Sequence, residues 1–209
     1  MTGPTREFWQ QRFVARETPW DRGAPSPQLA AWLEARSLAP CRILVPGCGS
    51  GHEVALLARM GFEVTALDYA PAAIALTRER LAQAGARATL VQADALEWTP
   101  AAPFDAVYEQ TCLCALHPDH WRAYADQLDA WLAPGARLYA LFLQATRPGA
   151  ADGLVEGPPY HCDINAMRAL FAPPRWAWPS PPYPRVPHPR GWAELALVLV
   201  HHAPAATSA

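Results

Sequence analysis

The chain has 209 residues, of which 51% are apolar and 17% charged, and its formal net charge is −2. This length and composition suit one folded domain with a substantial core. The charge is nearly balanced and the scattered positive side chains are all arginines, so the sequence lacks the basic stripe typical of proteins that bind nucleic acids or anionic membranes.

Targeting signals and cysteine usage indicate in which cellular compartment the protein is expected. Residues 1–13 contain no apolar stretch typical of a secretory signal, and no segment approaches the roughly 20 apolar residues of a membrane span. The five cysteines are an odd number, which is typical of reduced thiols, and Cys112-Leu113-Cys114 has the wrong spacing for a zinc knuckle. We therefore expect a cytoplasmic protein without a structural metal and without nucleic-acid or membrane partners.

Strand-like and helix-like stretches alternate from Arg42 to about Gln144. Short apolar runs predict strands, and apolar residues at helical spacing between them predict helices. The alternation indicates an α/β fold with a mostly parallel, seven-stranded sheet covered by helices on both faces, and ligands at the carboxyl ends of its strands. The predicted strands are 43–47, 62–67, 88–93, 104–108 and 137–143, and the predicted helices are 51–60, 72–84 and 118–131.

The last part of the chain fits an antiparallel finish to this sheet. A helix is predicted over 163–171 and a strand over 192–200. Between them, residues 173–189 are too rich in proline for a helix or a central strand, and we interpret them as a rigid surface connection rather than a ligand-binding loop. Residues 1–203 are thus expected to form a single domain, with a disordered tail over 204–209.

A glycine-rich loop, Val45-Pro-Gly47-Cys-Gly49-Ser-Gly51, follows the first predicted strand and opens a helix. Glycines let a ligand approach the backbone, and the helix N-terminus offers free N–H groups. The nicotinamide and flavin fingerprint G-x-G-x-x-G would require glycine where His52 stands. That departure disfavours an NAD-dependent oxidoreductase, whereas G-x-G-x-G resembles the first motif of the S-adenosylmethionine-dependent methyltransferases.

Two acids end the next two predicted strands. Asp68 follows Gly47 by 21 residues and could accept hydrogen bonds from both ribose hydroxyls of a nucleoside cofactor. Asp94 could accept from the adenine amino group, with the Ala95 N–H facing a ring nitrogen. Either acid alone would more simply be a helix cap or turn residue. Both at successive strand ends, after this loop, favour a cofactor site.

Five short motifs give the chain a family likeness from about Glu7 to about Val200. They are Phe8-Trp9-Gln-Gln-Arg-Phe13, Thr18-Pro-Trp20-Asp21-Arg-Gly23, Val45-Pro-Gly-Cys-Gly49, Tyr108-Glu-Gln-Thr111 and Gly157-Pro-Pro-Tyr160. Together they resemble the thiopurine methyltransferase family, most of all its branch of halide and thiol methyltransferases, best known from plants. The resemblance implies S-adenosylmethionine as cofactor, with S-adenosylhomocysteine as product, and a small-molecule acceptor.

The resemblance also implies roles for individual residues. Aromatic side chains of the N-terminal segment would cover the cofactor, and their faces would attract its sulfonium cation. The implied cofactor-binding residues are Trp9, Phe13, Trp20, Gly47, Gly49, Asp68, Asp94, Ala95 and Gln110. The N-terminal segment is expected to become ordered when cofactor binds, because aromatics that pack on a ligand lose their partner in its absence.

The acceptor would lie among Trp20, Gln110, Cys114 and Tyr160. Gln110 falls where thiopurine methyltransferases carry Arg and the plant branch carries Tyr, so we expect this site to lack a cation for anionic aromatic substrates. Cys114 matches a cysteine of the halide and thiol branch, although a buried cysteine is as readily a small hydrophobe. No catalytic residue is assigned with certainty.

We therefore expect a monomeric methyltransferase that acts on a halide, hydrosulfide or a thiol. Such acceptors are strong nucleophiles and need no general base, although His161 or Glu109 could deprotonate a neutral thiol. Two alternatives stay open. One is a methyltransferase of the same fold acting on thiopurines or metalloid oxyanions, and the other is a cofactor-binding module without turnover.

Overall fold

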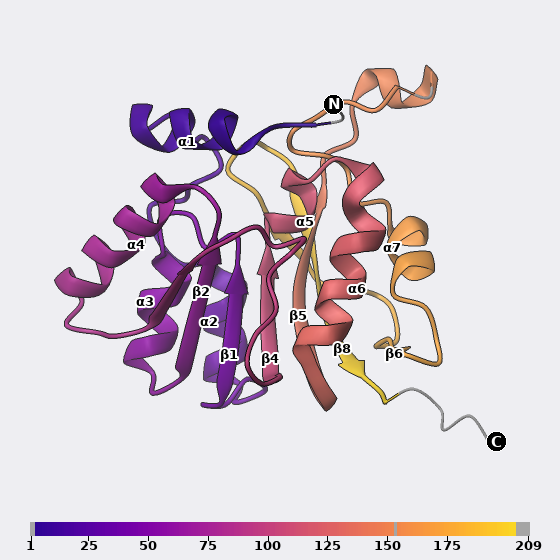
Figure 1. The fold of residues 1–209 in the computed structure, drawn as a ribbon. Helices are drawn as coiled ribbons and strands as arrows, with labels where there is room; N and C mark the ends of the chain where they lie inside the picture. The colour runs from indigo at the N-terminus through magenta and orange to yellow at the C-terminus, as the bar shows by residue number, and fades with distance from the viewer. Residues whose placement is uncertain (1–2, 153, 204–209) are drawn as a thin grey trace.

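A single twisted sheet forms the centre of the computed structural model, which describes residues 3–152 and 154–203 (Figure 1). Within these residues the sheet has eight strands in the order β3-β2-β1-β4-β5-β8-β6, with β7 paired to β8. The strands are β1 (Arg42–Pro46), β2 (Glu63–Asp68), β3 (Thr89–Gln92), β4 (Phe104–Gln110), β5 (Leu132–Gln144), β6 (Trp176–Ala177), β7 (Arg185–Pro187) and β8 (Ala193–His201).

Helices cover both faces of the sheet. One core lies beneath α2, α3 and α4, which contribute Leu29, Val54 and Ile74 to it. The other core lies on the opposite face of the sheet, beneath α6 and α7. Figure 1 shows α1 lying across the top of the molecule, above the carboxyl ends of the strands. The helices are α1 (Arg6–Ala15), α2 (Pro27–Glu34), α3 (His52–Arg59), α4 (Pro71–Gln83), α5 (Cys112–Ala115), α6 (Trp121–Trp131) and α7 (Ile164–Leu170), with 3₁₀ turns at Pro118–His120 and Pro148–Asp152.

Strand β1 shows why apolar runs in this sequence form central strands. Ile43 and Val45 point into the core beneath α2 and α3, whereas Leu44 points into the core beneath α6. Successive side chains of a strand face opposite sides of the sheet, so a strand covered by helices on both faces must be apolar throughout. Each such buried side chain contributes roughly 1.5–3 kcal/mol to stability.

The order of the strands in the sheet indicates where a ligand site is expected. β1 pairs in parallel with β2 and with β4, and the chain crosses from β3 back over β1 to β4. The carboxyl ends of β1 and β4 therefore lie side by side where the direction of the strand order reverses, which is where open α/β sheets bind their ligands. The predicted α/β fold with a mostly parallel sheet and helices on both faces is confirmed.

Some boundaries differ from the expectation. The sheet has an eighth strand because the proline-rich stretch 173–189 contributes β6 and β7, which pair antiparallel with the two ends of β8. Flanking prolines keep both strands short. β5 begins at Leu132 rather than 137, and the register shifts between Phe104 and Ala106 on its partner strand. The tail 204–209 lies outside the described residues.

Three helices, α1, α2 and α5, were not predicted, although the sequence carries start signals for α1 and α2. Thr5 accepts a hydrogen bond from the Phe8 N–H and caps α1, and Ser26 caps α2 with Pro27 at its first position. Such caps are the usual start signals of helices. Across the described ranges, every helix falls short of the length or apolarity needed to cross a membrane.

Candidate active site

A cavity of about 470 Å³ opens at the carboxyl ends of the strands. One half lies over β1, β2 and β3 and is lined by the glycine loop and by residues that follow β2 and β3. We call it the cofactor half. The other half lies over β4, β5 and β8, and we call it the acceptor half. The N-terminal segment, residues 8–24, contributes to the lining of the cavity.

The glycine loop has three residues in the left-handed region, with φ of +59° at Gly47, +52° at Gly49 and +73° at Gly51. A Cβ at Gly47 would lie 2.9 Å from the Cβ of Cys112, and one at Gly51 would lie 2.6 Å from Oγ1 of Thr77. At Gly49 the nearest atom would be Phe13 Cζ at 3.6 Å. Packing against the protein thus requires glycine at positions 47 and 51, and Gly49 has ordinary space around it.

Asp68 ends β2 and lines the cofactor half. Its Oδ2 accepts from the Gly49 N–H at 3.1 Å and its Oδ1 from the Ala70 N–H at 2.9 Å. Burial raises the pKa of this carboxyl to about 6, although the backbone hydrogen bonds act in the opposite direction. The side chain therefore caps the turn and also lines the cavity, and its contact with a ribose stays a prediction.

Asp94 and Ala95 follow β3 and also line the cavity. One carboxylate oxygen of Asp94 accepts from the Leu96 N–H at 2.8 Å, which again is the bond of a turn residue. The two acids, from neighbouring parallel strands, present carboxylates to one half of the cavity. This donor set fits the hydroxyl and amino groups of an adenine nucleoside.

Aromatic side chains of the N-terminal segment form one wall. Trp20 packs edge-on against Trp9, with ring centroids 5.4 Å apart, and against Phe13 at 6.1 Å. Two contacts hold the segment on the body of the protein: Gln10 accepts from the Ala72 N–H at 2.8 Å, and Asp21 pairs with His52 at 3.0 Å. All three aromatics line the cavity.

In the acceptor half, Gln110 and Cys114 line the cavity and Tyr160 does not, among the described residues. The backbone N–H of Tyr160 donates to the Cys114 carbonyl at 2.7 Å, and its ring, 5% exposed, packs edge-on against His117 at 5.3 Å. The expected contact of Tyr160 with the acceptor stays a prediction. Its motif reaches the cavity through Gly157, Pro158 and Pro159.

Neither candidate base lines the cavity, within the described part of the chain. Glu109 accepts from the Leu113 N–H at 2.7 Å, inside the core, and burial raises its pKa to about 7. Nδ1 of His161 accepts from the Ala145 N–H at 3.2 Å. Cys114 does line the cavity and is 4% exposed, but burial raises the pKa of its thiol well above its ordinary value. The thiol therefore stays protonated and forms part of the wall rather than a nucleophile.

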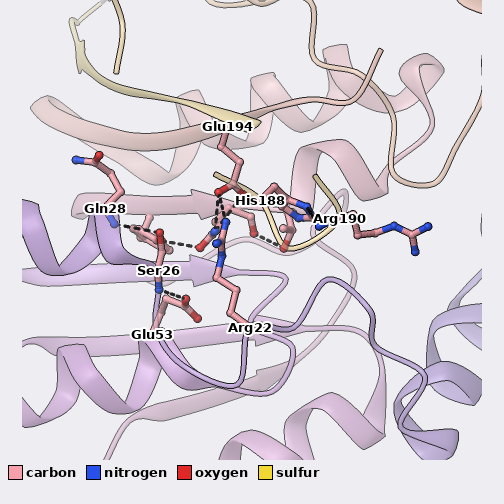
Figure 2. Close-up of polar contacts among 10 residues, drawn as sticks. Arg22, Ser26, Gln28, Glu53, His188, Arg190 and Glu194 are labelled. Carbon is pink, nitrogen blue, oxygen red and sulfur yellow. Dashed lines mark hydrogen bonds and ion pairs between the residues drawn. The ribbon is translucent and has the colours of Figure 1, made fainter. Parts of the chain in front are cut away.

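Charged residues that the sequence patterns did not predict line the acceptor half. Gln110 donates to both carboxylate oxygens of Glu194, at 3.0 and 3.2 Å, and Arg22 donates to the same carboxylate at 2.9 Å. Figure 2 shows Arg22 and Glu194 reaching toward each other, with His188 beside them. His188 and Arg190 also line the cavity.

Two expectations change as a result. The acceptor half does contain guanidinium groups, from Arg22 and Arg190, although position 110 is not an arginine. The proline-rich stretch is more than a surface connection, because His188 ends it and lines the cavity. One signal was readable in the sequence: Glu194 is a lone acid in the apolar run 193–200. The position of His188 had no such signal.

The fold and site define a class. Among solved structures, 1,6-didemethyltoxoflavin-N1-methyltransferase of Burkholderia thailandensis, which was determined with bound S-adenosylhomocysteine, superposes with a TM-score of 0.74. It is 21% identical, and the match covers 95% of this chain and 87% of that one. The chain therefore shares the α/β architecture of that methyltransferase.

The family follows from sequence comparison. A family model described as thiopurine S-methyltransferase matches residues 4–178. Two relatives from Arabidopsis thaliana, probable thiol methyltransferase 2 and thiocyanate methyltransferase 1, are each 29% identical over 167 residues, covering 79% of this chain and 71% of their own. The chain belongs to the thiopurine S-methyltransferase family and is an S-adenosylmethionine-dependent methyltransferase.

Proposed function

We propose that this enzyme methylates a small soft nucleophile, namely a halide, hydrosulfide or a thiol. The observation that carries the proposal is the lining of the acceptor half. Apolar and weakly polar groups dominate there: Cys114 on α5, Leu116 directly after that helix, Leu143 near the end of β5, and Pro158 and Pro159. Such a surface suits weakly hydrated, polarisable acceptors, and the names of the two Arabidopsis relatives agree with this class.

Different side chains would bind the cofactor, orient the acceptor and exclude water. When bound, S-adenosylmethionine supplies a methyl group activated on a sulfonium. Asp68 and Asp94 would hold its adenosine part, while Trp9, Phe13 and Trp20 would cover it and keep water out. The apolar wall would strip water from the acceptor and align it, and alignment can supply up to roughly 7–11 kcal/mol of a barrier in favourable cases.

A soft anion needs no proton removed, which agrees with where the candidate bases lie. Glu109 and His161 make their hydrogen bonds to backbone N–H groups and do not line the cavity, within the described residues. His188 does line it, but burial, together with the nearby Arg22 and Arg190, lowers the pKa of its imidazole to about 4. At neutral pH His188 is therefore an uncharged and weak base.

A second candidate function has an observation of its own. Arg22 and Arg190 line the acceptor half, and an anionic aromatic acceptor such as a thiopurine would gain from them. This alternative predicts that a thiopurine is a better acceptor than iodide or hydrosulfide.

The test is release of S-adenosylhomocysteine with iodide, bromide, hydrosulfide, thiocyanate, a small thiol and a thiopurine as acceptors. Strong turnover with iodide or hydrosulfide and little with the thiopurine supports the proposal, and the reverse order supports the alternative. Asp68→Ala serves as the control, because turnover that this substitution leaves undiminished at low cofactor concentration would come from a contaminant. Absence of turnover with every acceptor, in protein that binds the cofactor, would contradict both and leave a binding module.

We further propose that the enzyme acts as a monomer in the cytoplasm. The five free thiols are consistent with a reducing compartment, and the size of the cavity suits a small molecule beside the cofactor. Size-exclusion chromatography with light scattering tests the oligomeric state, and a dimer at micromolar concentration would contradict it.

A further inference from the structure

Glu194 is a buried acid in an apolar strand. It lies near the start of β8, where it pairs in antiparallel register with Leu143 of β5, and its relative exposure is 0%. A carboxylate without water requires donors, since an unpaired buried charge is strongly destabilising. The two side chains that donate hydrogen bonds to Glu194 both belong to residues that line the cavity, which connects this buried carboxylate to the acceptor half.

The two donors come from distant parts of the chain. Nη2 of Arg22, on the segment between α1 and α2, lies 2.9 Å from Oε2 of Glu194. Gln110, the last residue of β4, donates its amide to both carboxylate oxygens, and its own oxygen accepts from the Tyr108 hydroxyl at 2.7 Å. That last bond orients the Gln110 amide so that its NH₂ faces Glu194. Two lining residues therefore hold the carboxylate, and Figure 2 shows its contact with Arg22.

The charges of the acceptor half depend on this pair. Arg22 is 18% exposed at its side chain, and Arg190 and His188 line the same half. His188 adds no charge at neutral pH, because burial and the two arginines lower its pKa. Asp21 also lines the cavity and lies 3.0 Å from Nε2 of His52, but burial lowers the pKa of that imidazole, so the contact does not cancel the charge of Asp21. With Glu194 in place the charge of Arg22 is balanced, and without it a guanidinium and an amide would face the cavity with free donors.

We propose that Glu194 determines acceptor specificity by masking the positive charge of Arg22. The inference rests on the proposed function and deepens it by naming the acceptor class: nucleophiles whose only charge is on the reacting atom. An unmasked Arg22 would hold the remote anionic group of a larger acceptor. It would also bind a small anion in the ground state, and such binding does not by itself speed methyl transfer.

The experiment compares two aromatic thiols, one of which carries an additional carboxylate. Thiophenol and 2-mercaptobenzoate are assayed as acceptors with wild-type enzyme, Glu194→Gln, Arg22→Gln and the double variant, and kcat/KM ratios are compared between proteins. Glu194→Gln keeps the shape of the side chain and is expected to shift the ratio toward 2-mercaptobenzoate by roughly tenfold or more, the effect of one charge-assisted hydrogen bond. The double variant is expected to return to the wild-type ratio, because both charges are gone.

Each result either supports or contradicts the masking of Arg22 by Glu194. An unchanged ratio in folded Glu194→Gln would overturn the proposal, and so would a double variant that keeps the shifted ratio, since the effect would then not pass through Arg22. Arg22→Gln lies outside the core and remains informative if Glu194→Gln fails to fold. It leaves Glu194 bound by Gln110 but without a cationic partner and should lower the relative use of 2-mercaptobenzoate, so a rise or no change would contradict masking.

Failure of the proposed function can be distinguished from failure of the masking proposal. If the wild-type enzyme methylates neither thiol, calorimetric titration of 2-mercaptobenzoate into the protein with S-adenosylhomocysteine replaces the rate measurement. Masking then predicts binding roughly tenfold tighter or more in Glu194→Gln than in wild type. Equal affinity would overturn the masking inference independently of turnover.

Discussion

Replacing Gly51 with alanine tests the conformation assigned to the glycine loop. Gly51 has φ +73° and is the N-cap of α3. An added Cβ would lie 2.6 Å from Oγ1, 2.8 Å from Cγ2 and 2.9 Å from Cα of Thr77. The last of these atoms belongs to the backbone, so rotation of the threonine side chain cannot relieve that clash.

Three terms set the expected loss of stability. The left-handed conformation costs an alanine roughly 1–2 kcal/mol, and overpacking costs roughly 1–3 kcal/mol. Reduced freedom of the unfolded chain offsets about 0.4–1 kcal/mol. The free energy of unfolding should therefore fall by about 3 kcal/mol in Gly51→Ala. Gly85→Ala is the matched control, since Gly85 has φ +61° with nothing within 4 Å of its added Cβ, and it should lose only about 1 kcal/mol.

Equilibrium denaturant unfolding of the cofactor-free variants measures both losses. The difference between them isolates the steric clash with Thr77, at about 2 kcal/mol. Equal losses in Gly51→Ala and Gly85→Ala would refute the steric argument. A loss in Gly85→Ala as large as that expected for Gly51→Ala would refute the assigned cost of the backbone conformation.

Three further predictions concern cofactor binding. Asp68→Ala should weaken S-adenosylhomocysteine binding at least roughly tenfold, because charge-assisted hydrogen bonds are lost; an unchanged dissociation constant would remove Asp68 from the ribose site. Affinity of the wild-type protein should fall as the pH drops through about 6, because binding favours the ionised carboxylate and the pKa of free Asp68 is about 6. Calorimetry at several pH values checks this, and the dependence should disappear in Asp68→Ala. Cofactor should protect residues 6–22 from proteolysis, because Trp9 and Trp20 gain a packing partner, and equal digestion with and without cofactor would contradict that ordering.

The sequence by itself determined the fold and the cofactor half of the site. The apolar run of β1, the glycines after it and the acids Asp68 and Asp94 are local features with a fixed relation to a strand end. Parallel pairing brings the carboxyl ends of neighbouring strands to one edge, so the residues that follow them must meet whatever the packing details. The aromatics Trp9 and Trp20 could be placed through the family likeness.

Only the tertiary structure decided the acceptor half. Arg22 and Glu194 lie 172 residues apart in the chain, and they meet because β8 runs antiparallel beside β5 while the N-terminal segment folds over the strand ends. Tyr160 belongs to a matching motif, but its backbone bond to Cys114 and the packing of its ring against His117 are seen only in the tertiary structure. Sequence patterns record the periods of helices and strands, whereas the direction of one side chain depends on contacts between segments that the sequence does not order in space.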